Sequence, residues 1–417
     1  MNIDFSIIDD AIQFNNHEGM KVNYSSDPIS TNEFLIRNSD LLFENSIKEQ
    51  AIECFEINNY KAFFKNAEAD FPFDILAASF YLLSRYEEYL PHKKDNYGRY
   101  AHENSLAFKE HFLHLPIINI WTEDLAIQLQ QKFSTYTFQL LADGKKAPTF
   151  SFIPTYDIDI AYSFKHKGFL RNVGGFLKSP SLERIVVLAG LKKDPFDVYN
   201  WLDDLHREYQ LQPIYFFLLA SKNGIYDKNI LPDTKGMSQL IRRHAEKYKV
   251  AIHPSWQSGD NEILLKKEVA SLNSICFPNQ PDSLNIRHSR QHYIRFNLPE
   301  GYSKLYNAGI VNEYSMGYGS INGFRASVAT SFYWYDLKSE HTTKLKVHPF
   351  CYMEANSYYE QKLTPPDAFS EMMHYYNICR EVNGTLITIW HNHMLGSDEL
   401  YKGWSEIYLK FIQKTCV

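Results

Sequence analysis

Two aspartates, Asp157 and Asp159, end the apolar stretch "SFIPTYDID". Alternate residues of a strand point to the same side, so both carboxylates face one way if the strand continues. Their charges repel each other, and a divalent metal relieves that repulsion. One acid then binds the metal while the other accepts a proton from water. Taken alone, the D-x-D pattern favours two solvated acids, so its meaning depends on other residues.

Histidines close two further apolar stretches. His253 ends "YKVAIH", where Pro254 disfavours a helix and a neutral imidazole suits a metal ligand, although a lone histidine is more often structural. His391 and His393 follow "ITIW". A histidine there can give a proton to a leaving group, and we favour His391 because it directly closes the apolar run.

Arg290 lies in "NIRHSRQHYIRF", residues 285–296, between His288 and His292. These three side chains share one face if the segment is a strand. The guanidinium offers a planar fork for a carboxylate and suits Asp157 in its ionised form. The alternative is a basic strand edge that faces solvent. The apolar residues around these side chains make that alternative less favoured.

Four residues are candidates for substrate binding. Arg325 follows the glycine-rich "EYSMGYGSINGF" and offers a fork for a carboxylate or phosphate, although a plain glycine-rich turn is an equally good explanation. Tyr318 in the same stretch, Trp256 after the first histidine and His393 complete the set. Aromatic side chains often line sugar-binding grooves, but they also fill cores.

These residues sit at the ends of predicted strands that alternate with helical segments, a pattern typical of a parallel sheet with crossover connections. About seven strands in the second part of the chain suit a (β/α) barrel, which builds its active site on the rim where strands end. The predicted strands are 149–159, 213–220, 248–256, 285–296, 309–315, 345–353 and 384–391.

The 417 residues predict two domains, with a boundary in the polar "LADGKKAPTF" at 141–150. We expect an α+β domain of unknown role over 1–145 and the barrel over 150–417. The first part contains a helix in "FDILAASFYLLSRYEEYL", and we interpret Arg85, Glu87 and Glu88 as its solvated end.

Composition limits the function. The net charge of -6 provides no basic face for nucleic acid. Five scattered cysteines predict neither a disulfide framework nor a zinc ribbon, and favour a reducing compartment. We see neither a signal peptide nor a transmembrane segment, so the expected location is cytoplasmic.

The ordered set "TYDID", "IHPSW", "SRQHYIRF", "EYSMGYG" and "ITIWH" resembles the polysaccharide deacetylases, carbohydrate esterase family four, over residues 150–395. The resemblance is to a divergent bacterial branch with an extra N-terminal domain. It implies a distorted barrel of seven or eight strands and a divalent metal, often zinc, that serves to hydrolyse N-acetyl or O-acetyl groups on sugars. Cobalt, nickel and iron are alternatives.

The resemblance assigns roles residue by residue. Asp157 matches the catalytic base, Asp159 and His253 match metal ligands, Arg290 matches the residue that orients the base, and His391 matches the histidine near the leaving group.

The sequence departs from the family where a second metal-binding histidine is usual, because Gln257 stands there. His292 on the next predicted strand is our candidate for the missing ligand. The alternatives are weak binding through Gln257 or water, or no metal at all. Catalytic zinc usually has three protein ligands.

We therefore expect a metal-dependent deacetylase of an acetylated sugar, a glycan or its precursor, in surface polysaccharide metabolism. The alternative is a degenerate barrel that binds glycans or proteins without chemistry. A third hypothesis is a metal-dependent hydrolase whose substrate is a cyclic or linear amide.

Overall fold

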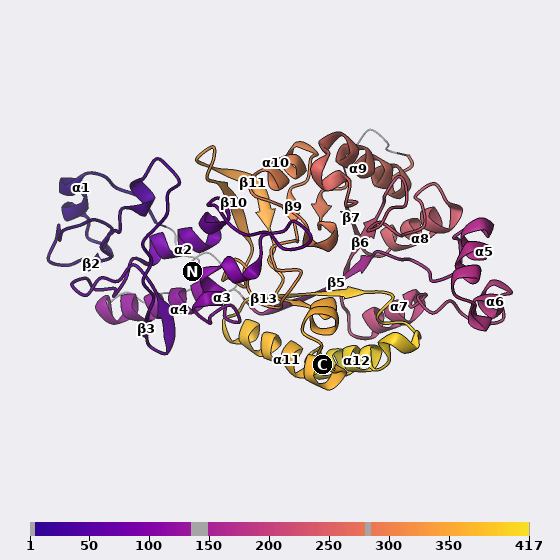
Figure 1. Ribbon diagram of the computed structural model, residues 1–417. Helices are drawn as coiled ribbons and strands as arrows, with labels where there is room; N and C mark the ends of the chain where they lie inside the picture. Colours follow the sequence, from indigo (N-terminus) through magenta and orange to yellow (C-terminus); the bar gives the residue numbers. More distant parts are fainter. Residues whose placement is uncertain (1–4, 135–148, 280–284, 417) are drawn as a thin grey trace.

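A nine-stranded sheet forms the centre of the protein in the computed structural model, which describes residues 5–134, 149–279 and 285–416 (Figure 1). The strands lie in the order β10-β11-β9-β8-β7-β6-β5-β13-β12, and only the β10–β11 pair is antiparallel. Their bounds are Ser151–Ile158 (β5), Ile214–Leu218 (β6), Lys249–His253 (β7), His288–Ser289 (β8), Asn312–Glu313 (β9), Phe332–Asp336 (β10), His341–Val347 (β11), Tyr352–Met353 (β12) and Thr385–His391 (β13).

The predicted mixed α/β class with a large, mainly parallel sheet is confirmed. Closure into a barrel stays a prediction, because the described strands pair in a linear order that ends at β10 and β12. The register brings the strand ends level: Asp157 on β5 lies opposite His391 on β13, and Leu218 on β6 lies opposite His253 on β7. Functional side chains from several strands therefore reach one edge of the sheet.

Three strand predictions need correction. The segment 285–296 contains only the two-residue β8, followed by a 3-10 turn at His292–Ile294, so Arg290 and His292 do not share a strand face. The segment 309–315 contains only β9. The segment 345–353 divides into β11 and β12 around Pro349, which lacks the N–H that a sheet interior requires. The strand β10, paired with β11, was not predicted.

Helices cover the sheet from both sides, with α8, α9 and α10 on one side and α7, α11 and α12 on the other in Figure 1. In α8 the buried Met237, Leu240, Ile241 and His244 recur with helical spacing, and Thr234 caps its first turn. The bounds are Tyr199–Glu208 (α7), Lys235–Ala245 (α8), Glu262–Cys276 (α9), Glu300–Asn307 (α10), Pro365–Glu381 (α11) and Trp404–Thr415 (α12). The helices Phe169–Lys178 (α5) and Leu182–Leu188 (α6) lie at one end of the molecule.

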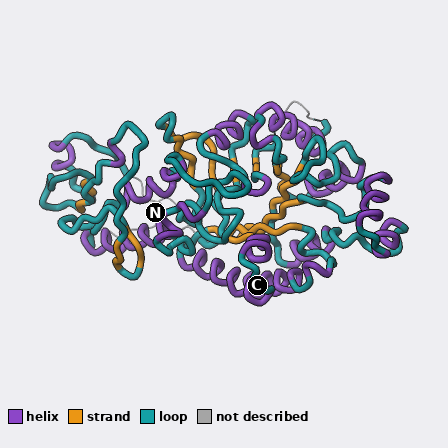
Figure 2. Tube along the Cα trace, in the orientation of Figure 1, coloured by secondary structure: helices purple, strands orange, loops and turns teal. Residues whose placement is uncertain are grey.

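The N-terminal region is built mostly of loops around short elements (Figure 2). Its helices and strands agree with the α+β prediction, and no described helix of the chain is long and apolar enough to cross a membrane. The domain limits stay a prediction, since the expected boundary falls largely on 135–148, outside the described residues. The elements are Ala11–Asn16 (α1), Val22–Asn23 (β1), Phe34–Leu35 (β2), Phe55–Ile57 (β3), Tyr60–Ala62 (β4), Ile75–Leu83 (α2), Leu106–Lys109 (α3) and Ile117–Lys132 (α4).

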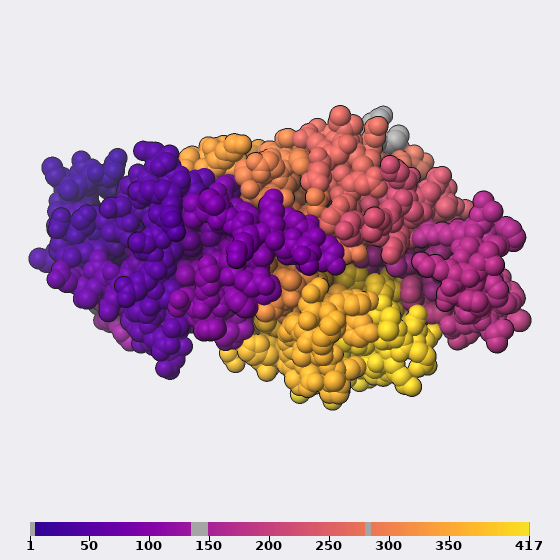
Figure 3. Space-filling model, viewed as in Figure 1, coloured from indigo at the N-terminus to yellow at the C-terminus, as the bar shows by residue number. Residues whose placement is uncertain are grey.

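The N-terminal region packs directly on the sheet-bearing part and reaches across it in Figure 3. The backbone N–H of Phe324 donates to the carbonyl of Leu113 at 2.8 Å, and that of Ile118 donates to Ser327 at 3.1 Å. A loop of the same region continues toward the strand ends, where Arg99 donates to the carbonyl of Tyr293 at 2.8 Å. The two parts therefore share an interface that extends to the candidate site.

The charged residues after α2 are buried, which corrects their interpretation as a solvated helix end. Arg85, Glu87 and Glu88 are 1%, 8% and 3% exposed. Glu88 accepts from Arg85 at 2.8 Å and from Arg325 of the sheet-bearing part at 2.6 Å. Burial raises the pKa of Glu88, but Arg325 and Arg85 lower it to about 2. The acid therefore stays ionised and ties the two parts together.

Candidate metal centre and active site

Asp159 lies immediately after β5 and faces two histidines. Its Oδ1 is 3.1 Å from Nε2 of His253 at the end of β7, and its Oδ2 is 3.3 Å from Nε2 of His292 in the turn after β8. One ligand atom from each residue lies within 4.8 Å of the other two, as a shared cation requires. The structure thus brings together the three residues that we expected to bind metal, and it does so through the unpredicted turn at His292.

The second nitrogen of each imidazole is engaged behind this centre. His253 Nδ1 lies 2.6 Å from the carbonyl oxygen of Arg290, and His292 Nδ1 lies 3.1 Å from Oδ1 of Asp227. These acceptors favour hydrogen on Nδ1, which leaves Nε2 of the neutral rings free to bind a cation. Oδ1 of Asp159 is buried without a hydrogen-bond partner in the described part of the chain, despite its closeness to His253. The donor set fits a divalent metal.

The charges of the centre are strongly coupled. Burial raises the pKa of Asp159, but the neighbouring His292 and His253 lower it well below its usual range. Burial lowers the pKa of His292, but Asp159 and Asp227 raise it to about 9. A cation requires neutral imidazoles, so a metal bound at this centre would compete with a proton on His292.

Asp157 is held beside the metal centre by Arg290. Its Oδ1 accepts from the guanidinium at 2.8 Å, and its Oδ2 lies 3.7 Å from Nε2 of His253. Arg290 is fully buried and also donates to Thr155 Oγ1 at 2.8 Å and to the carbonyl of Tyr314 at 3.1 Å. One carboxylate oxygen is therefore fixed, and the other faces the centre.

His391 closes the opposite side of the centre. Its Nε2 lies 3.4 Å from Oδ2 of Asp159, and its Nδ1 lies 2.8 Å from Oε1 of the buried Glu354. Burial lowers the pKa of His391, but Glu354 and Asp159 raise it well above its usual range. Because Nδ1 meets the carboxylate of Glu354, Nε2 is the nitrogen that faces the centre.

His393 lies next to His391, with ring centres 5.4 Å apart, and packs on Phe196. Its Nδ1 is buried and has no hydrogen-bond partner in the described residues. Burial and the charge of His391 lower its pKa to about 3, so the ring is neutral. A role in substrate binding stays a prediction.

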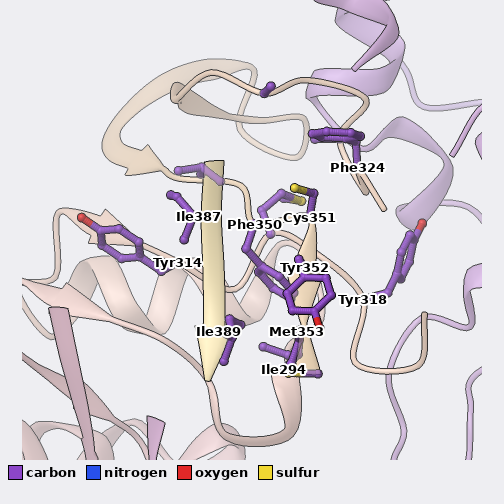
Figure 4. Close-up of a cluster of buried hydrophobic side chains, with 14 of the residues drawn as sticks. Ile294, Tyr314, Tyr318, Phe324, Phe350, Cys351, Tyr352, Met353, Ile387 and Ile389 are labelled. Atoms are coloured by element: carbon purple, nitrogen blue, oxygen red, sulfur yellow. The ribbon is translucent and has the colours of Figure 1, made fainter. Parts of the chain in front are cut away.

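Arg325 and Tyr318 occupy positions different from those expected for substrate-binding residues. Arg325 is 1% exposed, and its guanidinium is engaged by Glu88 and by the carbonyl of Gly317 at 3.1 Å. Tyr318 is also buried, in the hydrophobic cluster of Figure 4, and its hydroxyl accepts from Arg85 at 3.2 Å. The buried acid Glu88 is the physical reason, because it draws the guanidinium into the interface between the two parts.

Trp256 belongs to a group of half-buried aromatic rings beside the centre, which we call the aromatic wall: Tyr97, Tyr226, Trp256 and Tyr293. Trp256 stacks on Tyr226 with ring centres 3.9 Å apart, and Tyr97 contacts all three other rings. The ring of Tyr293 lies 4.6 Å from that of His292. Tyr97 comes from the N-terminal region, so both parts of the chain build this wall.

Sequence reasoning missed three of these residues. Asp227 lies in a loop, in "GIYDKN", and Glu354 lies in the short helical segment directly after β12, in "YMEAN". An acid alone carries no signal at either place. Tyr97 lies in "NYGRY", where the turn at Gly98 was the visible feature. Gln257 hydrogen-bonds Asp227, which in turn contacts Nδ1 of His292. Gln257 therefore supports the centre through Asp227.

Comparisons with known proteins found a family model and a distantly similar solved structure. A model described as "Family of unknown function (DUF7033)" matches residues 1–134. No curated protein sequence matches the chain. Among solved structures, a protein from Mycobacterium smegmatis provisionally assigned as a polysaccharide deacetylase is similar over 66% of this chain and 86% of its own, with 15% identity and a TM-score of 0.42.

Proposed function

We propose that the protein is a metal-dependent hydrolase of the polysaccharide deacetylase type, acting on an acetylated sugar. The observation that carries the proposal is the arrangement around Asp159: two imidazole Nε2 atoms at 3.1 and 3.3 Å, a second carboxylate on one side and a third imidazole, that of His391, on the other. An acid, a base and a metal centre within one site are the groups that hydrolysis of an amide or ester requires.

Asp159, His253 and His292 would hold the cation, with zinc favoured by a centre of two imidazoles and one carboxylate. The cation supplies Lewis-acid polarisation of the acetyl carbonyl and lowers the pKa of a nearby water.

The chain's own residues carry the proton transfers. Asp157, held by Arg290, takes a proton from the attacking water while the oxygen of that water forms a bond to the acetyl carbon. His391 then donates its Nε2 proton to the departing amine or alkoxide as the bond to the acetyl carbon breaks. Glu354 positions His391 through Nδ1. Acetate and the deacetylated sugar are the products.

The aromatic wall is our candidate for the sugar-binding surface, because pyranose rings pack well on half-exposed aromatic faces. We assign substrate binding to this wall and not to Arg325 and Tyr318, which are buried.

The test measures acetate release by protein loaded with zinc or cobalt, using N-acetylglucosamine oligomers and O-acetylated xylan. We expect acetate from at least one substrate class, and no release after removal of the metal. Metal-loaded protein that binds the oligomers without releasing acetate would instead support a glycan-binding module. Protein that binds no zinc, cobalt or nickel at all would overturn the metal centre.

A further inference from the structure

The segment between Asp159 and α7 contains two helices whose apolar sides face outward. None of the residues of α5 is buried, and Val187 is the single buried residue of α6. A surface helix of a globular protein normally turns its apolar side to the core. We call residues 163–193 the α5–α6 hairpin; it projects at the end of the molecule opposite the N-terminal region (Figures 1 and 3).

The exposed apolar side chains of the hairpin gather along both helices. In α5 they follow the spacing of one helical face, at positions 169, 170, 173 and 177. Eight large apolar side chains of the hairpin are between 40% and 85% exposed: Phe169, Leu170, Val173, Leu177, Leu182, Ile185, Leu188 and Leu191. An exposed apolar group of this size marks an interaction surface.

Polar contacts hold the hairpin in this orientation. Asp194 accepts from the backbone N–H groups of Ser163, Phe164 and Lys165 at 2.8, 2.8 and 3.0 Å. Arg171 donates to the carbonyl oxygens of Asn229 and Lys228 at 3.2 and 2.5 Å. These polar contacts fix the inner side of α5, and the exposed apolar side chains are left outward.

The hairpin is also strongly basic. It contains seven Lys and Arg residues and one acid, Glu183, in a chain whose net charge is -6. The hairpin thus carries a net charge of +6, and the rest of the chain is correspondingly acidic. An apolar stripe flanked by cations is typical of helices that lie in the interface of an anionic bilayer.

We propose that the α5–α6 hairpin docks the protein on an anionic lipid surface. The apolar residues enter the boundary between headgroups and acyl chains, while the lysines and arginines bind lipid phosphates. A second copy of the chain is a poorer occupant, because a symmetric dimer through this surface would place the two basic hairpins against each other. Since the hairpin follows directly after Asp159, docking holds the metal centre at the membrane. The proposal does not rest on the deacetylase assignment.

Vesicle flotation tests the proposal on the full-length protein. We expect wild type to float with vesicles of phosphatidylcholine and phosphatidylglycerol in a 3:1 ratio, and at least tenfold less with phosphatidylcholine alone. The variant Phe169→Ser/Leu170→Ser/Leu177→Ser/Leu182→Ser should lose at least tenfold in binding. The control Ile7→Ser/Ile12→Ser/Ile263→Ser/Leu400→Ser replaces four large apolar residues elsewhere that are also mostly exposed, and it should bind like wild type.

The charge component is tested with Lys178→Glu/Lys193→Glu, which should weaken flotation several-fold, against Lys267→Glu/Lys344→Glu at exposed positions outside the hairpin. All these positions are exposed, so thermal melting should be unchanged. Wild type that fails to float with anionic vesicles, or a four-serine hairpin variant that floats equally well, would overturn the proposal. So would a wild-type dimer that the four-serine variant converts to a monomer while neither binds vesicles.

Discussion

His292 Nδ1 lies 3.1 Å from Oδ1 of Asp227, while the Nε2 atom of the same ring faces Asp159 at 3.3 Å. Gln257 also hydrogen-bonds Asp227. Asp227 therefore connects His292 to a supporting amide in the segment that follows His253.

This relationship predicts how metal affinity depends on the two residues. His292→Ala removes a ligand and should lower zinc affinity by more than about 100-fold, since even a supporting partner is worth about 10–100-fold. Gln257→Ala should cost about tenfold or less. Competition with a chromophoric chelator measures both. His288→Ala, in the same segment but bonded to Tyr314, is the control. Equal losses for His292→Ala and His288→Ala would contradict the assignment.

Asp157→Asn should lower kcat for acetate release by about 10²–10⁴-fold, because the amide can still accept from Arg290 but is a far weaker base. Zinc content should remain that of wild type, since we assign no metal contact to Asp157. Loss of the metal along with activity would instead make Asp157 a ligand.

Glu354→Gln should weaken catalysis through His391. Glu354 raises the pKa of that imidazole, so its removal lowers the pKa and the acid form is lost at a lower pH. In the plot of kcat against pH, the alkaline limb should move to lower pH, and kcat itself should fall by about tenfold or more. Glu360→Gln, at the exposed end of the same helical segment, is the control. A merely structural role of Glu354 would lower activity without moving the limb.

Tyr97→Ala and Trp256→Ala should raise KM for an oligosaccharide by about five- to tenfold, as expected for the loss of about 1 kcal/mol of aromatic packing. The kcat should change little, because neither ring contacts the proposed acid or base. Tyr306→Ala, a partly exposed ring on α10, provides the comparison. An unchanged KM for both wall variants would remove the aromatic wall from the proposal.

Glu88→Gln should destabilise the fold by about 3–5 kcal/mol, because it leaves the guanidinium of Arg325 buried and without a charged partner. Urea unfolding followed by tryptophan fluorescence measures the change, and Glu103→Gln at an exposed position is the control. The double variant Glu88→Met/Arg325→Met should recover most of the loss, since it removes both charges.

Sequence periodicity and residue type determined the mixed α/β class and selected Asp157, Asp159, His253, Arg290 and His391 as members of one site. This worked because parallel strands end at a common edge, so reactive side chains at successive strand ends must lie near one another. Prediction from the sequence failed where the position of a side chain depends on contacts between residues far apart in the chain. The predicted strand at 285–296 ends after two residues, and only the turn that follows carries His292 to Asp159.

The roles of buried acids were decided by tertiary structure alone. Glu88 and Arg325 are 237 residues apart, and each alone has the character of an exposed surface residue. Paired, they are buried, because the attraction between opposite charges and their hydrogen bonds offset the loss of water. Asp227 and Tyr97 lie in loops, and Glu354 lies in a short helical segment, all without a periodic pattern. The sequence therefore contains the residues of the site, but only the folded chain shows which of them meet.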